Sequence, residues 1–514
     1  MRWLILSAVC GLLFGTAPLL ADGEKSGEEG KQKQPQKQPT NEQPVKQPVL
    51  INKARGRYAI VVANDFEDQD FDGVQTKWSE VLKLLKEKYQ KTGCKVFRYK
   101  GLPNDDAALK KALAAYKPVY VCFLRRPKRC SIKFCVSVIK LMRSLDDDPY
   151  PDAIWAIFTA YNDKDALKMV EARPLLVRRH LSHVGGGWLK WFESGVSFNE
   201  GKRGEKWIKE PGKEPKKVKG PNDTAEQWVK VLNKNDVDIL STSGHATERH
   251  WQMGYPRWGG KVKPVGGGKL AGFENLGRGK RHDIKTNNPK IYYSPGNCLI
   301  AHIPCERRFI RDCMVLSWMH NGVYQFFGHI LPQTRWCTAW GVANQFFALQ
   351  DTYTFAEAVY ANRVAARYLT DNHKQGREKR FWDRCLHITV LYGDPAWEAR
   401  MKRIRDPLYE FKFDVQDAEG GRKKATLTLK FNYKCKMGHR NVPVFLLPFF
   451  ISDWKIEKID KGKAVVADNF VLFDLLGEEF NKGDKVKLVF SFKKVTDLKQ
   501  GEKPQEKQPV GDKR

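Results

Sequence analysis

The chain has 514 residues, of which 41% are hydrophobic and 12% are aromatic. This composition excludes a wholly disordered protein, and the length leaves room for two or three domains with full cores. The formal net charge of +31 excludes an acidic surface and favours an acidic partner, such as an anionic glycan, a cell-envelope polymer or an acidic protein. Simple solubility explains the charge about equally well, and we expect no specific nucleic-acid partner.

The first residues have the form of a secretion signal. Arg2 supplies a charge, Trp3 to Leu13 is apolar, and Ala21 is the expected cleavage point. The apolar run is too short to span a membrane, and no later stretch is long and apolar enough to do so. The sequence therefore predicts a signal peptide over residues 1–21, no transmembrane segment, and a bacterial protein that is secreted or periplasmic.

Two polar segments flank the rest of the chain. Residues 22–50 and 497–514 are rich in Lys, Gln, Pro and Glu, so they bury too little apolar area to fold. We expect a disordered linker and a disordered tail.

Between these segments, apolar runs alternate with helical patterns. The runs at 57–64, 94–101, 118–124 and 154–161 predict buried strands, and amphipathic segments between them predict helices, one of which we expect to be capped by Ser131. This alternation predicts an α/β domain over residues 51–401, with a mostly parallel sheet flanked by helices. Most of residues 173–236 is interpreted as a surface excursion, and 259–280 as a long glycine-rich loop.

The C-terminal part has a different pattern. Short runs such as ATLTLKFNY and KVKLVFSF alternate between apolar and polar residues, with turn residues between the runs. This pattern predicts an all-β, immunoglobulin-like sandwich over residues 402–496.

Two apolar runs end in glycine-bearing turns that present a reactive side chain. One run leads from Val237 through Gly244 to His245, and the other leads from Lys290 to Cys298. If the two strands are neighbours, an imidazole and a thiol meet at one edge of the sheet. A cysteine nucleophile needs such a base nearby in space rather than in sequence.

The order of these motifs resembles the gingipain-like cysteine peptidases, which belong to the caspase-like group. The resemblance rests on Ile239 to His245, Tyr292 to Cys298, Cys313 to His329, and the late LYGDP at Leu391 to Pro395. It covers roughly residues 57–401 and is looser over the sandwich. It implies a caspase-like fold and a secreted endopeptidase that acts on protein or peptide substrates.

The resemblance also assigns roles to residues. Cys298 would attack the peptide carbonyl, His245 would move the proton, and the N–H groups of Cys298 and Ala246 would bind the oxyanion. Ala246 stands where members of the family often carry glycine. Asp152 lies where the family has an acidic residue before a strand, so it either orients His245 or caps a turn.

Several alternatives remain open from the sequence. His250 is a second candidate base, but no glycine precedes it. His302, Cys305 and Cys313 suggest zinc, although their spacing fits no compact ligand motif, and we expect no metal in the site. The acidic run at residues 146–148 suggests a structural calcium ion, with a solvated turn as the simpler interpretation. The rival function is a catalytically inert relative that binds the cell envelope through a basic surface.

Overall fold

The computed structural model describes residues 56–66, 75–255, 259–305, 310–333 and 338–495. All of them belong to one compact unit. The predicted signal peptide, linker and C-terminal tail lie outside the described residues. Among the residues described, no helix combines the length and the apolar character needed to cross a membrane.

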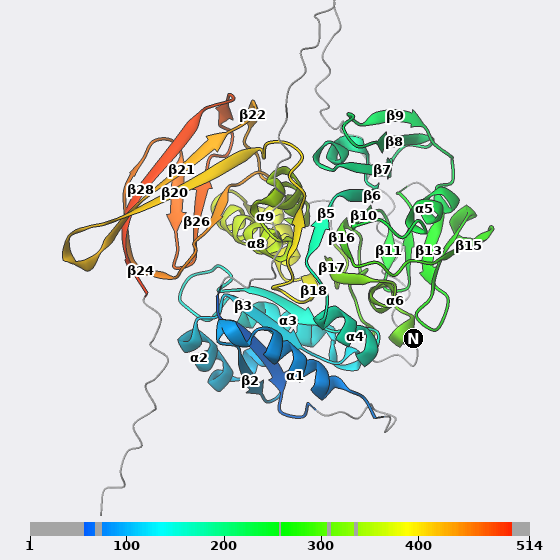
Figure 1. Ribbon diagram of the computed structural model, residues 1–514, viewed down its shortest axis with the longest axis horizontal. Coiled ribbons are helices and arrows are strands. Elements are labelled where there is room, and N and C mark those ends of the chain that lie inside the picture. Colours follow the sequence, from blue (N-terminus) through cyan, green and yellow to red (C-terminus); the bar gives the residue numbers. More distant parts are fainter. Residues whose placement is uncertain (1–55, 67–74, 256–258, 306–309, 334–337, 496–514) are drawn as a thin grey trace, which may run out of the picture. The chain divides into compact units, whose positions relative to one another are not determined.

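A large sheet of twelve strands organises the chain (Figure 1). Its strand order is β2-β1-β3-β4-β18-β17-β16-β10-β6-β7-β8-β9. The strands are β1 (Tyr58–Ala63), β2 (Lys95–Tyr99), β3 (Tyr120–Leu124), β4 (Ile154–Phe158), β6 (Arg179–His183), β7 (Ser194–Phe198), β8 (Glu205–Lys209), β9 (Lys216–Lys219), β10 (Ile239–Ser243), β16 (Lys290–Gly296), β17 (Val323–His329) and β18 (Thr389–Gly393). The predicted mixed α/β architecture with a mostly parallel sheet is confirmed at this level.

The direction of the strands divides the sheet into two halves. Neighbouring strands are parallel except at β17–β18, β7–β8 and β8–β9. We call β2, β1, β3, β4 and β18 the first half, and β17, β16, β10, β6 and β7 the second half. Because β17 and β18 run in opposite directions, the carboxyl ends of the two halves lie at opposite edges of the sheet.

The strands β1, β3, β4 and β18 of the first half are buried on both faces, whereas the edge strand β2 is partly exposed. In β1, Tyr58, Ile60 and Val62 join one hydrophobic cluster, whereas the alternating residues Ala59, Val61 and Ala63 join the other. A strand covered on both sides needs apolar residues at every position, which is why YAIVVA is continuously hydrophobic.

Helices cover both faces of the sheet. One cluster contains apolar side chains of α1 (Trp78–Lys88), α4 (Asp163–Val170), α8 (Phe355–Asn372) and α9 (Gly376–Leu386). The other contains side chains of α2 (Ala107–Tyr116), α3 (Ile132–Leu141), α5 (Ala225–Leu232) and α6 (Met314–His320). The N-cap predicted at Ser131 is confirmed, because its hydroxyl accepts the backbone N–H of Phe134 at 3.2 Å.

The predicted surface excursion over 173–236 was wrong for its central part. β6 and β7 extend the large sheet beside β10. The sequence of β6, RHLSH, is mostly polar, yet His180, Ser182 and His183 are all buried. A strand whose buried positions are polar gives no hydrophobic pattern, so it was missed.

The predicted glycine-rich loop over 259–280 was also wrong. It folds into β13 (Lys261–Pro264) and β14 (Leu270–Phe273), which join β11 (Ala246–Thr247), β12 (His250–Gln252) and β15 (Arg281–Ile284) in an antiparallel sheet. The glycines at 266–268 have positive φ angles and form the turn between β13 and β14, so glycine here marks a hairpin rather than an unstructured loop.

The C-terminal region consists of antiparallel sheets, as expected for a β-sandwich. One sheet has the order β20-β21-β28-β24 and another has the order β23-β26-β25. The strands are β20 (Tyr409–Asp417), β21 (Lys423–Phe431), β23 (Val444–Leu446), β24 (Ile451–Ile459), β25 (Lys463–Val466), β26 (Phe470–Asp474) and β28 (Lys485–Lys494). Their inward side chains belong to the same hydrophobic cluster as α8, so this region and the α/β region share a core.

Candidate active site

The two reactive residues follow adjacent parallel strands at equivalent positions. β10 pairs with β16, and the last paired residues are Ser243 and Gly296. His245 and Cys298 each lie two residues beyond this pair. Neighbouring strands are about 4.8 Å apart, so the turns that carry the imidazole and the thiol leave the sheet side by side.

Glycine is required at both strand ends. Gly244 has φ +105°, and a Cβ there would lie 2.8 Å from the carbonyl oxygen of Gln252. At Gly296, a Cβ would lie 2.1 Å from the hydroxyl of Ser243. Glycine at 296 allows the ends of β10 and β16 to approach this closely, and glycine at 244 allows the end of β10 to approach the segment from Gln252 to Gly254.

A sharp turn after the second strand exposes the thiol. Leu299 has φ +56°, a left-handed conformation that costs a branched residue about 1–3 kcal/mol and is concentrated at functional sites. Cys298 is half-buried, and its Sγ lies 3.4 Å from the backbone nitrogen of Gln333. The Cys298 Sγ also lies 3.7 Å from the carbonyl oxygen of Gln333, so the backbone of this one residue offers both a donor and an acceptor to the sulfur.

Asn297 connects the two turns. Its side chain is fully buried, and its amide Nδ2 donates to the carbonyl oxygen of Gly244 at 2.8 Å. Its Oδ1 accepts hydrogen bonds from the hydroxyls of Thr242 (2.7 Å) and Ser294 (2.6 Å). The residue before Cys298 is therefore bonded to the residue before His245, which fixes the relative position of the two reactive groups.

The backbone N–H of Ala246 is oriented away from its neighbouring strand. The N–H of Gln252 donates to the carbonyl of His245 at 2.8 Å, and the register pairs Ala246 with Trp251. Since hydrogen-bonded and non-hydrogen-bonded pairs alternate in antiparallel ladders, Ala246 is in a non-hydrogen-bonded pair. β11 is also the edge strand of its sheet, so this N–H is directed away from β12 and is available to a ligand.

A buried carboxylate lies at the same edge of the sheet. Glu200 is two residues beyond the end of β7, and burial raises its pKa to about 7 although Ser243 donates a hydrogen bond to it. Its Oε2 is buried and has no hydrogen-bond partner among the residues that the structure describes. A carboxylate oxygen in this state is destabilised until a donor or a cation reaches it.

Tyr255 connects Glu200 to the two reactive residues. Its backbone N–H donates to the carbonyl of Glu200 at 3.0 Å, and its hydroxyl lies 3.1 Å from the Oγ of Ser243. Its ring meets the ring of His245 edge to face, with centroids 5.5 Å apart. Burial raises the pKa of Tyr255 to about 12, and the charges of Glu200 and Cys298 add to this shift. The phenol therefore stays neutral and close to both groups.

Asp152 is not brought to this site. It precedes β4, and four strand-to-strand steps separate β4 from β10, which is about 19 Å at the usual strand spacing. Its carboxylate accepts the backbone N–H of Leu145 at 3.1 Å, and burial raises its pKa to about 9. Of the two roles expected from the sequence, the geometry corresponds to the turn cap and not to the partner of His245.

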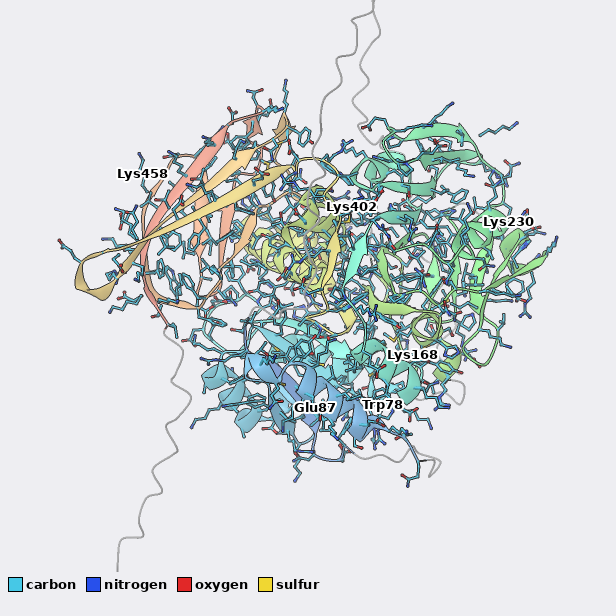
Figure 2. The ribbon with its side chains drawn as sticks, in the orientation of Figure 1. Trp78, Glu87, Lys168, Lys230, Lys402 and Lys458 are labelled. Atoms are coloured by element: carbon cyan, nitrogen blue, oxygen red, sulfur yellow. The ribbon has the colours of Figure 1, made fainter. Side chains whose placement is uncertain are left out.

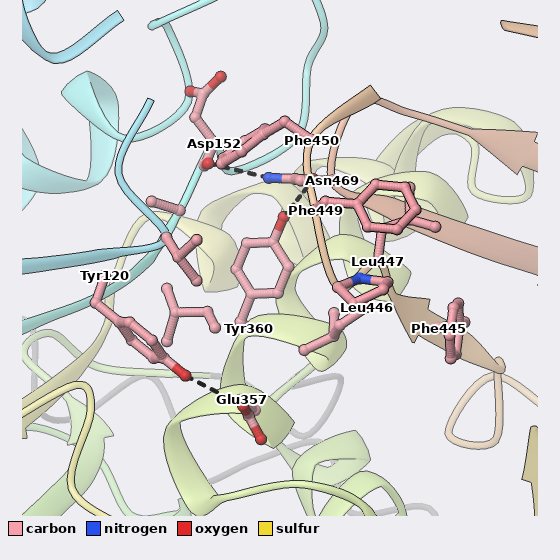
Figure 3. A pocket seen from close by; sticks show the side chains of 14 residues that line it. Tyr120, Asp152, Glu357, Tyr360, Phe445, Leu446, Leu447, Phe449, Phe450 and Asn469 are labelled. Atoms are coloured by element: carbon pink, nitrogen blue, oxygen red, sulfur yellow. Dashed lines mark hydrogen bonds between the residues drawn. The ribbon is translucent and has the colours of Figure 1, made fainter. Parts of the chain in front are cut away.

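Asp152 lines a different cavity, of about 190 Å³ (Figure 3). The cavity lies where β4 and α8 meet the C-terminal sandwich. Tyr360 and Asn469 are joined by a hydrogen bond of 3.0 Å, and Tyr120 donates to Glu357 at 3.2 Å. The remaining lining is mainly apolar, with Phe445 to Phe450 on one side. Its polar side chains bond one another or the backbone, so this cavity has no reactive arrangement.

The remaining candidates have local roles. His250 Nδ1 lies 3.1 Å from the Thr247 hydroxyl across the β11–β12 hairpin, and burial lowers its pKa. The carboxylates of Asp146 and Asp148 accept backbone N–H groups within their own turn. Over the described ranges, His, Cys, Asp and Glu side chains form no group of three that could hold a metal ion. The described residues therefore offer no set of ligands for the zinc or calcium ion that the sequence suggested.

Sequence reasoning missed Glu200 and Tyr255, and it gave Asn297 no role. A signal for Glu200 was present, because SGVSFNEG is also an apolar run that ends in a polar residue and a glycine. Tyr255 follows an antiparallel hairpin and has no comparable pattern. Asn297 could be recognised as a connector only after the pairing of β10 with β16 was known.

Comparisons with known proteins give little further information. No protein-family model matches the chain, and no curated protein matches it. Among solved structures, the chain is similar to the crystal structure of the Arg-specific cysteine proteinase gingipain R, with a TM-score of 0.39 and 11% sequence identity. The match covers 82% of this chain and 91% of that one. This likeness is remote, and the functional argument below rests on the site geometry.

Proposed function

We propose that the chain is a cysteine peptidase in which Cys298 is the nucleophile and His245 is the general base and acid. One observation carries this proposal: the pair Ser243–Gly296 ends two adjacent parallel strands, and the two reactive residues each follow it by two positions. The exposure of His245 and the partial exposure of Cys298 leave both side chains accessible to a substrate.

The reaction would proceed through a thioester. The Cys298 thiolate attacks the carbonyl carbon, and the oxyanion receives hydrogen bonds from the N–H groups of Cys298 and Ala246. The His245 imidazolium then gives its proton to the leaving amine as the C–N bond breaks. His245 next takes a proton from water, whose oxygen attacks the thioester and releases the acid and the Cys298 thiolate. The imidazolium and thiolate are thereby restored together.

Glu200 suggests which substrates enter the site. Its buried Oε2 has no hydrogen-bond partner in the described part of the chain and lies at the same sheet edge as the dyad. A lysine or arginine side chain of the substrate supplies both the missing donor and a compensating charge. We infer that the residue before the cleaved bond is basic and that its side chain reaches Glu200.

The proposal also includes three more specific assignments about the domains and the location of the chain. They comprise a caspase-like catalytic domain over 51–401, an immunoglobulin-like sandwich over 402–496, and secretion after removal of residues 1–21. The mostly parallel sheet with helices on both faces supports the first assignment, and the antiparallel C-terminal sheets support the second. The sequence pattern alone supports secretion.

Three substitutions test the dyad on fluorogenic peptides with a basic residue before the scissile bond. Cys298→Ala should lower kcat/KM at least about a thousandfold. His245→Ala should lower it similarly at neutral pH, while iodoacetamide still alkylates Cys298 at a rate that rises toward the free-thiol pKa near ~8.5. His250→Ala is the matched control, because it changes the same hairpin, and it should keep most of the activity.

The outcomes separate three interpretations. An inactive His250→Ala together with an active His245→Ala would mean that the base is His250. If the wild type cleaves nothing across a broad peptide library and its Cys298 reacts no faster than an ordinary thiol, the catalytically inert relative is the correct interpretation.

A further inference from the structure

The outward face of the sheet β20-β21-β28-β24 is strongly basic. In β21, Ala425, Leu427 and Leu429 are buried, so the alternating residues face solvent. β28 follows the same rule, with Val486, Leu488, Phe490 and Phe492 buried. The solvent face carries lysines from all four strands: Lys412, Lys424, Lys430, Lys455, Lys458, Lys485 and Lys487.

Three of these lysines gather at one end of the face, where the residue opposite Lys430 on β20 is Glu410. Lys430 is directly opposite Lys485 in the β21–β28 ladder, and Lys487 is the next outward residue along β28. Like charges directly opposite each other destabilise a sheet. In the part of the chain that the structure describes, none of the three enters an ion pair. The nearby acids are engaged elsewhere: Glu410 lies 2.6 Å from Arg403, and Asp414 lies 2.9 Å from Lys412.

The three lysines line a shallow hollow of about 450 Å³, together with Lys412 and the carboxylates of Glu410 and Asp414. Its floor carries the hydroxyls of Thr426 and Thr428, which are partly exposed. Ammonium groups around hydroxyls provide donors for carboxylates and for neutral sugar hydroxyls alike. The hollow is large enough for a sugar unit rather than a single ion.

The basic face extends beyond the hollow. Lys455 is in register with Ser491, six residues along β28 from Lys485, which is about 20 Å at the usual rise per residue. Lys458 lies between them on β24 and projects from the same sheet (Figure 2). Positive charges spread over this distance suit a chain with repeated negative groups better than a lone anion.

We propose that this face binds an anionic polysaccharide that carries carboxylate groups. The described lining of the hollow contains no arginine, and its one aromatic residue, Phe411, is half-buried. Nucleic-acid surfaces generally combine phosphate contacts with exposed aromatic rings or planar guanidinium groups, so the lysine and threonine lining favours a glycan. Bound to such a polymer, the sandwich would hold the catalytic region at an extracellular matrix or envelope.

Binding to alginate, a linear polyuronate, tests the proposal on the full mature chain without any peptidase measurement. The triple variant Lys430→Gln, Lys485→Gln, Lys487→Gln should bind immobilised alginate at least about tenfold more weakly at low salt, and added salt should weaken wild-type binding by screening. The control variant Lys110→Gln, Lys111→Gln, Lys133→Gln removes the same charge from exposed positions on α2 and α3. It should change the affinity less than about threefold.

Three results would overturn the proposal. The first is a wild type that does not bind alginate above a neutral dextran control. The second is an equal loss of affinity in the two triple variants, which would assign binding to net charge rather than to this face. The third is tighter binding to duplex DNA than to alginate at equal charge concentration, which would make the partner a nucleic acid. None of these results depends on whether Cys298 is catalytic.

Discussion

The two halves of the twelve-stranded sheet have the same architecture but differ in the residues at the carboxyl ends of their strands. In both halves parallel strands are buried on two faces, with helices against them. In the first half, β1, β3 and β4 are apolar to their last residue, with the sequences YAIVVA, YVCFL and IWAIF. In the second half, β10 ends in Ser-Thr-Ser, β6 is RHLSH and β17 ends in Gly-His.

This difference distinguishes strand ends that stabilise the core from strand ends that position the site residues. Buried polar groups destabilise a core unless they are hydrogen-bonded, so a series of them at the carboxyl ends of the second half must serve another purpose. One of them, Thr242, bonds to Asn297, which in turn bonds to Gly244 and so connects the two site turns. The first half has its own buried polar group, Asp394, which accepts hydrogen bonds from Tyr58 (3.0 Å) and Tyr89 (2.5 Å) and pairs with Lys88. The comparison predicts that disrupting Asn297 impairs catalysis, whereas disrupting Asp394 impairs folding.

Among the substitutions that test the comparison of the two halves, the largest effect is expected from Asn297→Ala. Without the amide, the Gly244 carbonyl loses its donor and the turns of His245 and Cys298 are no longer held together. We expect kcat to fall about a hundredfold, because small misplacements of reacting groups have effects of this size. KM should change less, since Asn297 is fully buried and does not touch the substrate. Steady-state kinetics on the peptides described above measure both constants.

A second measurement distinguishes positioning from general damage in this variant. Alkylation of Cys298 by iodoacetamide should continue, but its rate should lose the acceleration below pH 8 that an imidazole partner provides. If Asn297→Ala kept the wild-type pH profile of alkylation and full kcat, Asn297 would have no positioning role.

The corresponding substitution in the first half is Asp394→Asn. It removes the charge that pairs with Lys88 and one acceptor of the tyrosine hydroxyls, so we expect a loss of about 2 kcal/mol in the free energy of unfolding. Urea unfolding followed by tryptophan fluorescence measures this loss. The kcat of the folded fraction should stay within about threefold of wild type. A large loss of kcat with unchanged stability would contradict the division between the halves.

The same comparison explains what the sequence could predict. The first half was predictable because continuous apolar runs leave few alternatives to buried strands, and Ser131 marked a helix start correctly. In the second half, β10 and β16 were recognised because each begins with apolar residues before its polar end. β6 and β7 were not recognised, because His180, Ser182 and Ser197 occupy buried positions where a pattern based on hydrophobicity expects apolar side chains.

The candidate site was predictable to a similar extent. His245 and Cys298 stood out because glycine-bearing turns followed apolar strands, and the pairing of β10 with β16 places them as expected. The partner expected from a sequence position, Asp152, lies four strands away from β10, because the order of the strands between β4 and β10 could not be inferred from the sequence. Glu200 follows one of the strands that were missed, so it was missed with that strand.

The smallest expected effect concerns Glu200 and depends on pH. Burial raises its pKa to about 7 in the folded protein, whereas an unfolded glutamate titrates near ~4.3. Between these two values the folded state keeps a proton that the unfolded state has lost, so this group makes the protein less stable as the pH rises from about 4.5 to about 7. Above pH 7 both states are ionised and the loss is complete.

Glu200→Gln removes this titration, because an amide stays neutral at every pH. Compared with wild type, the variant should be about 1–2 kcal/mol more stable at pH 8 and nearly equal at pH 5. Urea unfolding at the two pH values measures the difference.

The same variant should lose the preference for lysine or arginine before the scissile bond. It should also lose any rise of kcat/KM through pH 7 on such substrates, while cleavage after alanine should be unchanged. A stability difference without a change in preference would leave Glu200 as a buried acid of the second half that does not contact the substrate. A change in both would mean that the same unpartnered oxygen destabilises the free protein and selects the substrate.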